Sequence, residues 1–435
     1  MAATGERPAG EQAGSLWQAT APPARDWPAL AGEIEVAVAI VGAGYSGLST
    51  ALALAKAGQA GEVAVLEART PGYGASGRNN GLVIPTLTRG DPADMEARLG
   101  AERGQRFAAL VRDSAALTFA LIRAEGIDCD AVQKGWVQPA HRPSRLLQQQ
   151  ARVRQWQALG ARAELLDAAE LERRIGARGY HGGWIAADGG HLHPLAYARG
   201  LAEAVAARGV PLYAESPVRR IERRAGRWRL ETPAGAVLAE QVLLATAAYT
   251  GRLWPALAGT VVPIRAFQAA TEPVGRNLRG LVNPEDLAVS DTRADLHFFH
   301  YDRDHRLVSG GGLFLHGGAD ARLQRLVSRR LAETFPELGR LAVTHAWNGF
   351  LAVNPERFPH LYELGPGLWS WIGCNGRGVA LATAMGPVMA RLLQGAGEGE
   401  LPLPVERPQA LPHHALHRVG ARLMLPLYRW RDSRD

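Results

Sequence analysis

The chain has 435 residues, a length typical of two or three domains. Hydrophobic residues make up 47% of it and charged residues 21%, which excludes a wholly disordered, collagen-like or coiled-coil protein. The net charge of +7 is a modest excess. Its arginines are scattered among acidic residues, without the basic stripe that is typical of a nucleic-acid-binding protein.

The first predicted unit is a strand, a glycine turn, a helix and a second strand. Residues 35–41 form an apolar run of strand length, and a helical, alanine-rich segment begins at Leu48. A second apolar run, at 63–66, ends at Glu67. The turn after the first strand has the pattern G-x-G-x-x-G and consists of Gly42, Ala43, Gly44, Tyr45, Ser46 and Gly47.

Each part of this unit has a physical task in binding a dinucleotide. The three glycines permit a tight turn, a close approach to a pyrophosphate, and close packing of helix on strand. The helix start supplies free N–H groups to phosphate, and Glu67 is placed to bind a ribose diol. We therefore predict that Gly42, Gly44, Tyr45, Ser46, Gly47 and Glu67 bind a dinucleotide. The pattern leaves NAD and FAD open, and its alternatives are a ligand-free glycine turn and a membrane span over 36–55.

A second glycine cluster follows at 72–81, with the sequence GYGASGRNNG. It resembles the G-x-G-A-S-G-R-N-G-G stretch of FAD-dependent amine and amino-acid oxidoreductases of the D-amino-acid oxidase superfamily, which includes glycine and sarcosine oxidases. It is most similar to the γ-glutamylputrescine oxidoreductase branch, which usually has glycine at the position of Asn80. The resemblance implies FAD as the cofactor and adds these cofactor-binding residues: Ala75, Ser76, Arg78, Asn79, Asn80 and Gly81.

Helical patterns follow at 91–127, 143–174 and 194–209, and strand-like pieces then run to Leu244. A strand at 368–372, glycines at 373, 376 and 378, and a helix at 379–393 form a second strand–glycine–helix junction. Such a helix start favours an anionic group, although a structural turn is the alternative. Weaker resemblances to the same family extend over roughly 15–395. They complete the predicted cofactor set with Val218, Ala245, Thr246, Gly376, Arg377, Gly378 and Val379.

The predicted fold is α/β, with a Rossmann-like FAD-binding domain interleaved with an α+β substrate domain on a mainly antiparallel sheet. After an N-terminal lead at 1–29, the FAD-binding domain takes 30–90, 165–255 and 345–400. The substrate domain takes 91–164 and 256–344, and 401–435 is a C-terminal tail. We expect the substrate-domain sheet to contain strands at 261–271, 296–301 and 307–311.

The resemblance implies oxidation of a C–N bond, with hydride transfer to flavin N5 and hydrolysis of the resulting imine. The candidates for lining the substrate site are His300 and Tyr301 at a strand end, Arg265 for a substrate carboxylate, and Trp347 over the flavin. For each of them a packed or surface position is the alternative. His191 and His193 lack an acid or cysteine cluster beside them, so we predict no metal site.

The position where sarcosine oxidases hold flavin through a cysteine falls near Trp347, so we predict non-covalent FAD. Cys374 is expected to be a buried small residue. The lysines that sarcosine oxidases use for oxygen and substrate correspond to positions near Val308 and at Ala380, which leaves oxygen or an electron carrier as the acceptor. We expect a small amine or amino acid as the substrate and no nucleic-acid partner.

The sequence also leaves rival functions open. The C-terminal segment RLMLPLYRWR mixes arginine with leucine and aromatic residues, which allows a membrane-peripheral dehydrogenase, for example of a pipecolate-type imino acid. An ordinary packed C-terminal helix is the alternative. A tRNA-base-modifying flavoenzyme and a non-enzymatic flavoprotein are further rivals. Two cysteines and the absence of a signal-peptide pattern favour the cytoplasm.

Overall fold

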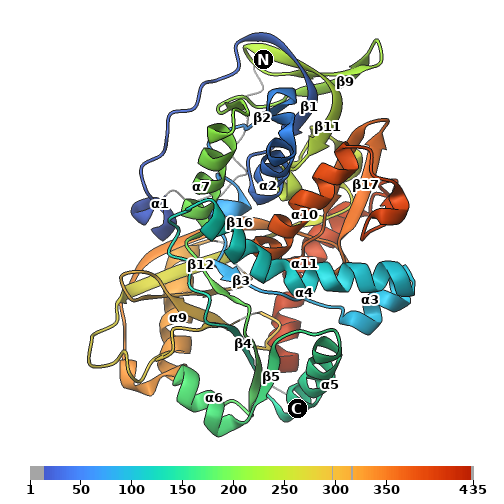
Figure 1. The fold of residues 1–435 in the computed structure, drawn as a ribbon. Helices are drawn as coiled ribbons and strands as arrows, with labels where there is room; N and C mark the ends of the chain where they lie inside the picture. Colours follow the sequence, from blue (N-terminus) through green and yellow to red (C-terminus); the bar gives the residue numbers. More distant parts are fainter. Residues whose placement is uncertain (1–13, 296, 315–316, 433–435) are drawn as a thin grey trace.

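The computed structural model describes residues 14–295, 297–314 and 317–432, and these residues form two large sheets (Figure 1). A nine-stranded sheet occupies the upper half of the view and an eight-stranded sheet the lower half. Strands β12 and β16 lie near the boundary between the two, and the long helix α4 crosses the middle of the molecule.

The nine-stranded sheet has the order β19-β17-β18-β11-β1-β2-β8, and β10 and β9 extend it from β11. Its centre is parallel, because β1 pairs in parallel with both β11 and β2. The four C-terminal residues of β1 and all of β2 are buried, as expected for central parallel strands. Its strands are β1 (Gly32–Val41), β2 (Val63–Leu66), β8 (Leu212–Tyr213), β9 (Arg220–Arg224), β10 (Arg227–Glu231), β11 (Gly235–Leu244), β17 (His360–Gly365), β18 (Leu368–Ile372) and β19 (Val405–Glu406).

The eight-stranded sheet has the order β16-β12-β15-β14-β13-β4-β6-β5 and is antiparallel except between β13 and β4. Its strands are β4 (Trp136–Pro139), β5 (Ala163–Leu166), β6 (Gly183–Ala186), β12 (Val262–Pro273), β13 (Ala288–Ser290), β14 (Phe298–Tyr301), β15 (Arg306–Gly311) and β16 (Val343–Val353). A small third sheet pairs β3 (Leu82–Val83) with β7 (Gly190–His191). The predicted fold class and the three predicted substrate-domain strands are confirmed.

Helices cover both sheets. Above the boundary, α2, α7 and α10 pack around the nine-stranded sheet, while α5, α6 and α9 lie around the eight-stranded sheet (Figure 1). The α-helices are α1 (Leu16–Thr20), α2 (Tyr45–Leu54), α3 (Pro92–Leu99), α4 (Ala101–Ala124), α5 (Pro143–Ala158), α6 (Ala168–Ile175), α7 (Pro194–Ala207), α8 (Pro255–Ala258), α9 (Ala319–Thr334), α10 (Gly378–Leu393) and α11 (His414–Asp432). No helix within the described ranges combines the length and the apolar character that a membrane crossing requires.

Two sequence expectations differ from this architecture. The single helix predicted over 143–174 is wrong: the segment forms α5, strand β5 and helix α6, and β5 takes an edge of the eight-stranded sheet. In β5 the end residues Ala163 and Leu166 are buried and the two between them are exposed. Apolar residues three apart also occur on one face of a helix, so the helical pattern continued across this strand. Strands β6 and β16 fall in ranges that we assigned to the FAD-binding domain, yet both belong to the eight-stranded sheet. The domain boundaries themselves stay a prediction.

Candidate active site

The turn between β1 and α2 has the geometry that the glycine pattern predicts. Gly42 has φ +108°, which is a left-handed conformation that favours glycine. A Cβ atom on Gly47 would lie 2.0 Å from the Gly42 carbonyl oxygen, so only glycine lets α2 begin this close to β1. Gly44 is the N-cap of α2 and offers no side chain to its free N–H groups. Ser76 accepts the N–H of Tyr45, and the N–H groups that follow it at the helix start remain available to a phosphate.

Glu67 follows β2 and lies beside the same turn. One carboxylate oxygen accepts a hydrogen bond of 2.8 Å from the N–H of Ala43, and the other accepts one of 2.9 Å from the N–H of Arg69. Burial raises the pKa of Glu67, against these backbone hydrogen bonds. The carboxylate is thus fixed at the end of a parallel strand, where the ligand of such a sheet binds.

The second glycine cluster packs directly on the first. The hydroxyl of Ser76 accepts a hydrogen bond of 3.1 Å from the N–H of Tyr45, and the Tyr45 hydroxyl donates one of 2.6 Å to the Ser76 carbonyl. Asn79 donates from its side chain to the carbonyl of Ser76 and accepts from the N–H of Gly81. Asn80 has no positive φ, so the position does not require the glycine that the family usually has there. These bonds fix the loop against the start of α2.

Three consecutive carbonyl groups of this loop are held by three separate elements. The Arg78 carbonyl accepts a hydrogen bond of 3.0 Å from the indole N–H of Trp347 on β16. The Asn79 carbonyl accepts one of 2.8 Å from the indole N–H of Trp17 on α1, and the Asn80 carbonyl lies 2.6 Å from Nε2 of His300 on β14. The backbone of the loop is therefore positioned by the N-terminal lead and by the eight-stranded sheet together.

One cavity, called the larger cavity below, opens beside this loop and has a volume of about 1040 Å³. Its lining joins Asn79 and Asn80 to Gly376 and Arg377, so two of the three glycine clusters meet here. Strand β12 supplies residues 263–268 to the lining. Among these, the side-chain Oε1 of Gln268 is buried and has no hydrogen-bond partner among the residues that the structure describes. A buried polar atom of this kind is expected to bind a ligand or a water molecule.

The lining of this cavity is strongly cationic. Its aspartates already have basic partners, for example Asp91 at 2.6 Å from Arg152 and Asp295 at 2.6 Å from Arg330. The arginines outnumber them, which leaves an excess positive charge for an anionic ligand. The charged lining residues are Arg89, Arg142, Arg145, Arg152, Arg265, Arg293, Arg357, Arg377, Arg431, Asp91, Asp291, Asp295 and Asp432.

Arg377 is the most deeply buried of the arginines that line this cavity. It is the N-cap of α10, is only 9% exposed, and lies with its guanidinium 5.0 Å from the centre of the Trp136 ring. Burial, with a contribution from Arg152, lowers the pKa of Arg377 to about 9. No carboxylate among the described residues forms a salt bridge with it. A buried charge without a counter-ion is costly, so this position calls for an anion.

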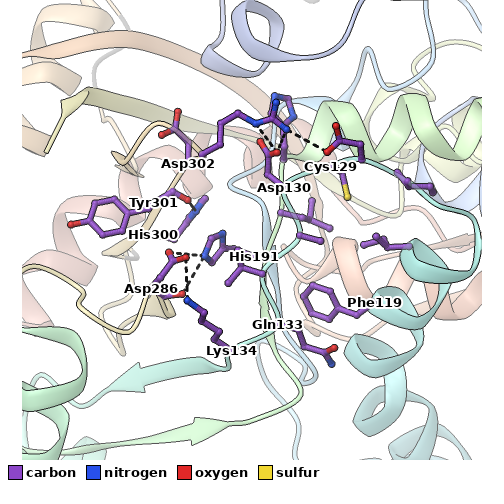
Figure 2. Close-up of a pocket in the computed structure, with 18 of the residues that line it drawn as sticks. Phe119, Cys129, Asp130, Gln133, Lys134, His191, Asp286, His300, Tyr301 and Asp302 are labelled. Atoms are coloured by element: carbon purple, nitrogen blue, oxygen red, sulfur yellow. Dashed lines mark hydrogen bonds and ion pairs between the residues drawn. The ribbon is translucent and has the colours of Figure 1, made fainter. Parts of the chain in front are cut away.

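The structure separates the four residues that we predicted to line the substrate site. Arg265 lines the larger cavity and lies with its guanidinium 5.3 Å from the centre of the Phe350 ring. His300 and Tyr301 line the smaller cavity, of about 830 Å³ (Figure 2). Trp347 is fully buried and packs against Trp17. Their catalytic roles stay predictions, and the contacts of His300 and Trp347 favour positioning of the cofactor loop.

Within the smaller cavity, Figure 2 shows His191 pointing to Asp286, at a distance of 3.1 Å, with Lys134 beside the same carboxylate. His193, the other histidine of the pair considered for a metal, caps α7 by accepting from the N–H of Ala196. Within the described ranges, no group of three His, Cys, Asp or Glu residues is arranged to hold a metal.

His300 predicts a pH dependence of stability. Burial, with a contribution from His191, lowers the pKa of His300 from 6.5 to about 3. The unfolded chain therefore binds a proton that the folded protein rejects, so this contribution to stability is lost as the pH falls from about 6.5 to about 3. We expect His300→Gln to reduce the proton uptake on unfolding at pH 4–5 by about one proton, measured by urea unfolding across pH. His297, with a pKa also lowered to about 3, is the matched position. An unchanged proton uptake in both variants would contradict the prediction.

The remaining predicted cofactor residues lie near the same edge of the nine-stranded sheet. The N–H of Ala245 donates 2.9 Å to the Val41 carbonyl, and a Cβ on Gly42 would lie 2.9 Å from the Ala245 carbonyl oxygen. Thr246 exchanges a hydrogen bond with Thr250, and Val218 is half-buried against the core of this sheet. Gly376 and Gly378 flank Arg377, and Val379 is buried in α10. These roles stay predictions.

Sequence reasoning missed the far side of the cavity. Arg142, Arg145, Gln149 and Arg152 all line it and come from α5 and its N-cap. Their spacing of three or four residues places them on one helix face. The sequence showed this segment as a charged amphipathic helix, but the face it presents to the cavity depends on where α5 packs.

This arrangement fits FAD. The open N-terminus of α2 suits a pyrophosphate, the fixed carboxylate of Glu67 suits a ribose, and the cavity at Asn80 and Gly376 has room for a ring system. Fold and site together define a flavin-dependent oxidoreductase. The family model described as FAD dependent oxidoreductase matches residues 37–392, and the chain belongs to this family.

Individual relatives agree with this assignment. The chain is 31% identical over 391 residues to gamma-glutamylputrescine oxidoreductase of Escherichia coli (strain K12), a match that covers 89% of this chain and 90% of the relative. Among solved structures, glycine oxidase from Geobacillus kaustophilus superimposes with a TM-score of 0.69 at 23% identity, covering 83% of this chain and 95% of the other. L-proline dehydrogenase from P. horikoshii gives a TM-score of 0.71 at 18% identity, covering 85% and 96%.

Proposed function

We propose that this protein oxidises the carbon–nitrogen bond of a small amine or amino acid that carries a carboxylate, with non-covalently bound FAD as the electron acceptor. The observation that carries the proposal is Arg377, a buried cation without an acidic partner among the described residues, in a cavity lined by excess arginine. The names of the relatives support an amine or amino acid as the substrate.

When bound, FAD would accept a hydride from the carbon next to the substrate nitrogen. Gly42, Gly44 and Gly47 at the start of α2 would hold its pyrophosphate, and Glu67 its ribose. The loop at 78–81, fixed through its carbonyl groups, would position the ring against the cavity. The imine product then hydrolyses in water.

The cationic lining serves this reaction in two ways. A guanidinium such as that of Arg377 binds a carboxylate with a charge-assisted hydrogen bond and so orients the substrate. The same positive charge disfavours a protonated amine close by and lowers its pKa. An amine donates a hydride only when it is neutral, so the arginines also favour the reactive form of the substrate. The buried side-chain oxygen of Gln268, which has no partner among the described residues, would accept a hydrogen bond from the amine.

The test is anaerobic bleaching of the flavin by matched pairs of compounds, each an amino acid and its amide. The amide keeps the amine and the carbon to be oxidised but removes the negative charge. We expect the acid of at least one pair to reduce the flavin with a KM at least about tenfold lower than its amide. If acid and amide reduced the flavin equally well, the proposal that the substrate carries a carboxylate would be wrong. If no amine reduced the flavin, the proposed oxidation itself would be wrong. Peroxide formed per turnover in air then distinguishes oxygen from a carrier as the acceptor.

Non-covalent binding has its own test. Cys129 and Cys374 are the only two cysteines of the chain, and burial raises the pKa of both thiols, that of Cys129 to about 12. Cys129 is buried, whereas Cys374 is partly exposed, so the expectation of a fully buried Cys374 is wrong. A thiol that stays protonated is nevertheless a poor nucleophile toward flavin. We therefore expect acid precipitation of the purified protein to release the yellow flavin entirely into the supernatant. A pellet that stays yellow after washing would contradict this prediction.

A further inference from the structure

The C-terminal end of α11 docks onto the eight-stranded sheet through buried charge. The guanidinium of Arg429 lies 2.7 Å from a carboxylate oxygen of Asp295, which also binds Arg330 at 2.6 Å. Asp295 is only 6% exposed. A second guanidinium nitrogen of Arg429 donates 2.8 Å to the Gly312 carbonyl. This ion pair attaches the helix firmly, because removing one of the partners would leave buried charge that is no longer fully compensated.

The last residues of the helix continue this contact across the cavity. Asp432 accepts a hydrogen bond of 2.7 Å from the N–H of Ala294 on the sheet side. On the opposite side, Arg142 at the N-cap of α5 donates 2.7 Å to the carbonyl of Arg431. The end of α11 therefore connects two segments of the cavity lining that are far apart in sequence, α5 and the loop before β14.

The connecting residues themselves line the cavity. Trp430, Arg431 and Asp432 belong to its lining together with Arg142 and Arg145. Trp430 is 51% exposed, which places this part of the lining at the opening to solvent. Asn80 and Gly376 of the glycine clusters belong to the same lining. The C-terminal end of the chain lies at the lower end of the molecule, away from α2 and α10 (Figure 1). The tail that the sequence left open as a membrane contact is thus built into the cavity.

We propose that the end of α11, residues 429–432, is the outer wall of the substrate cavity and contacts the end of the substrate farthest from the oxidised carbon–nitrogen bond. The inference rests on the proposed function and adds a specificity determinant to it. The wall combines the Trp430 ring with Arg431 and the neighbouring Arg142 and Arg145. These three arginines outnumber its one carboxylate, Asp432, which accepts the N–H of Ala294. It suits an extended substrate whose outer end is anionic, and a short substrate leaves the wall uncontacted.

The test uses the FAD-loaded protein and a series of dicarboxylates from malonate to adipate, with acetate as the short reference. Binding is measured from the change of the flavin absorption spectrum, which does not require turnover. In the intact chain we expect affinity to rise with ligand length. In Trp430→Ala and in a chain ending at residue 428, we expect the Kd of the best long ligand to rise at least about tenfold. The Kd of acetate should change less than about twofold.

The control variant is Leu416→Ala, which alters an exposed residue of the same helix outside the cavity lining and should leave every Kd unchanged. The truncated chain lacks Arg429 and its ion pair with the buried Asp295, so it could fail to fold. Trp430→Ala then still provides the test, because it removes only a half-exposed side chain and keeps Arg429. If the variants lost affinity equally for acetate and adipate, or lost none for either, the proposal that residues 429–432 contact the outer end of the substrate would be wrong. These outcomes are independent of amine oxidation, so a protein that binds dicarboxylates by length but oxidises no amine would overturn the proposed function alone.

Discussion

Replacing Gly47 with valine is expected to abolish FAD binding and to destabilise the protein by about 3 kcal/mol or more. The new side chain would begin 2.0 Å from the Gly42 carbonyl oxygen and 3.1 Å from a methyl group of Ile40. Neither neighbour can move away, since one is backbone and the other is in the core between β1 and α2. The start of α2 would have to shift, and with it the N–H groups that face the phosphates.

The measurement is the flavin absorbance of the purified protein together with its thermal unfolding midpoint. Gly61→Ala is the matched control, because a Cβ there meets nothing within 4 Å and its φ is not positive. It should keep both the flavin and the midpoint. A Gly47→Val protein that purifies with a full complement of FAD would show that the turn does not hold the cofactor.

Arg377→Met is expected to separate stability from ligand binding. The methionine keeps an apolar contact with Trp136 but removes a buried charge that has no acidic partner among the described residues, so the unfolding midpoint should stay the same or rise. Loss of a charge-assisted hydrogen bond of about 1.5–3 kcal/mol should raise the Kd of carboxylate ligands about 10- to 150-fold.

Flavin spectral titration and thermal unfolding measure the two effects on the same preparation. Arg325→Met on α9 is the control, because Arg325 is exposed and outside the cavity lining. A variant that binds FAD more weakly but, once loaded with FAD, binds carboxylates normally would place Arg377 with the cofactor alone. A large drop in the unfolding midpoint would mean that its charge is compensated within the fold.

The cofactor turn was predictable because its constraints are local. Strand, glycines, helix and acid occur within 33 residues, from Glu35 to Glu67, and each is tied to a backbone requirement that only certain residues meet. The positive φ of Gly42 and the contact at Gly47 follow from that spacing. The second strand–glycine–helix junction, between β18 and α10, could be predicted for the same reason.

Features that depend on distant packing were not predictable. The helical period continued through β5, and only pairing with β6 shows that this segment is a strand. His300 lies at the end of β14, as the sequence predicts, but the sequence did not show that its ring faces the smaller cavity and the Asn80 carbonyl. The arginines of α5 were visible as a charged face, but which cavity they line depends on tertiary contacts that no local pattern records.

The three carbonyl bonds of the cofactor loop have a consequence for how the chain assembles. Trp17 comes from the beginning of the sequence, and His300 and Trp347 come from two different strands of its last third. Each of the three fixes one peptide of residues 78–80. The loop can reach its final conformation only after all three elements have arrived. Flavin uptake would then come late in folding, and a fragment lacking either sheet would lose the cofactor along with the missing strands. The flavin colour of a preparation thus measures the fraction of chains in which both sheets have assembled.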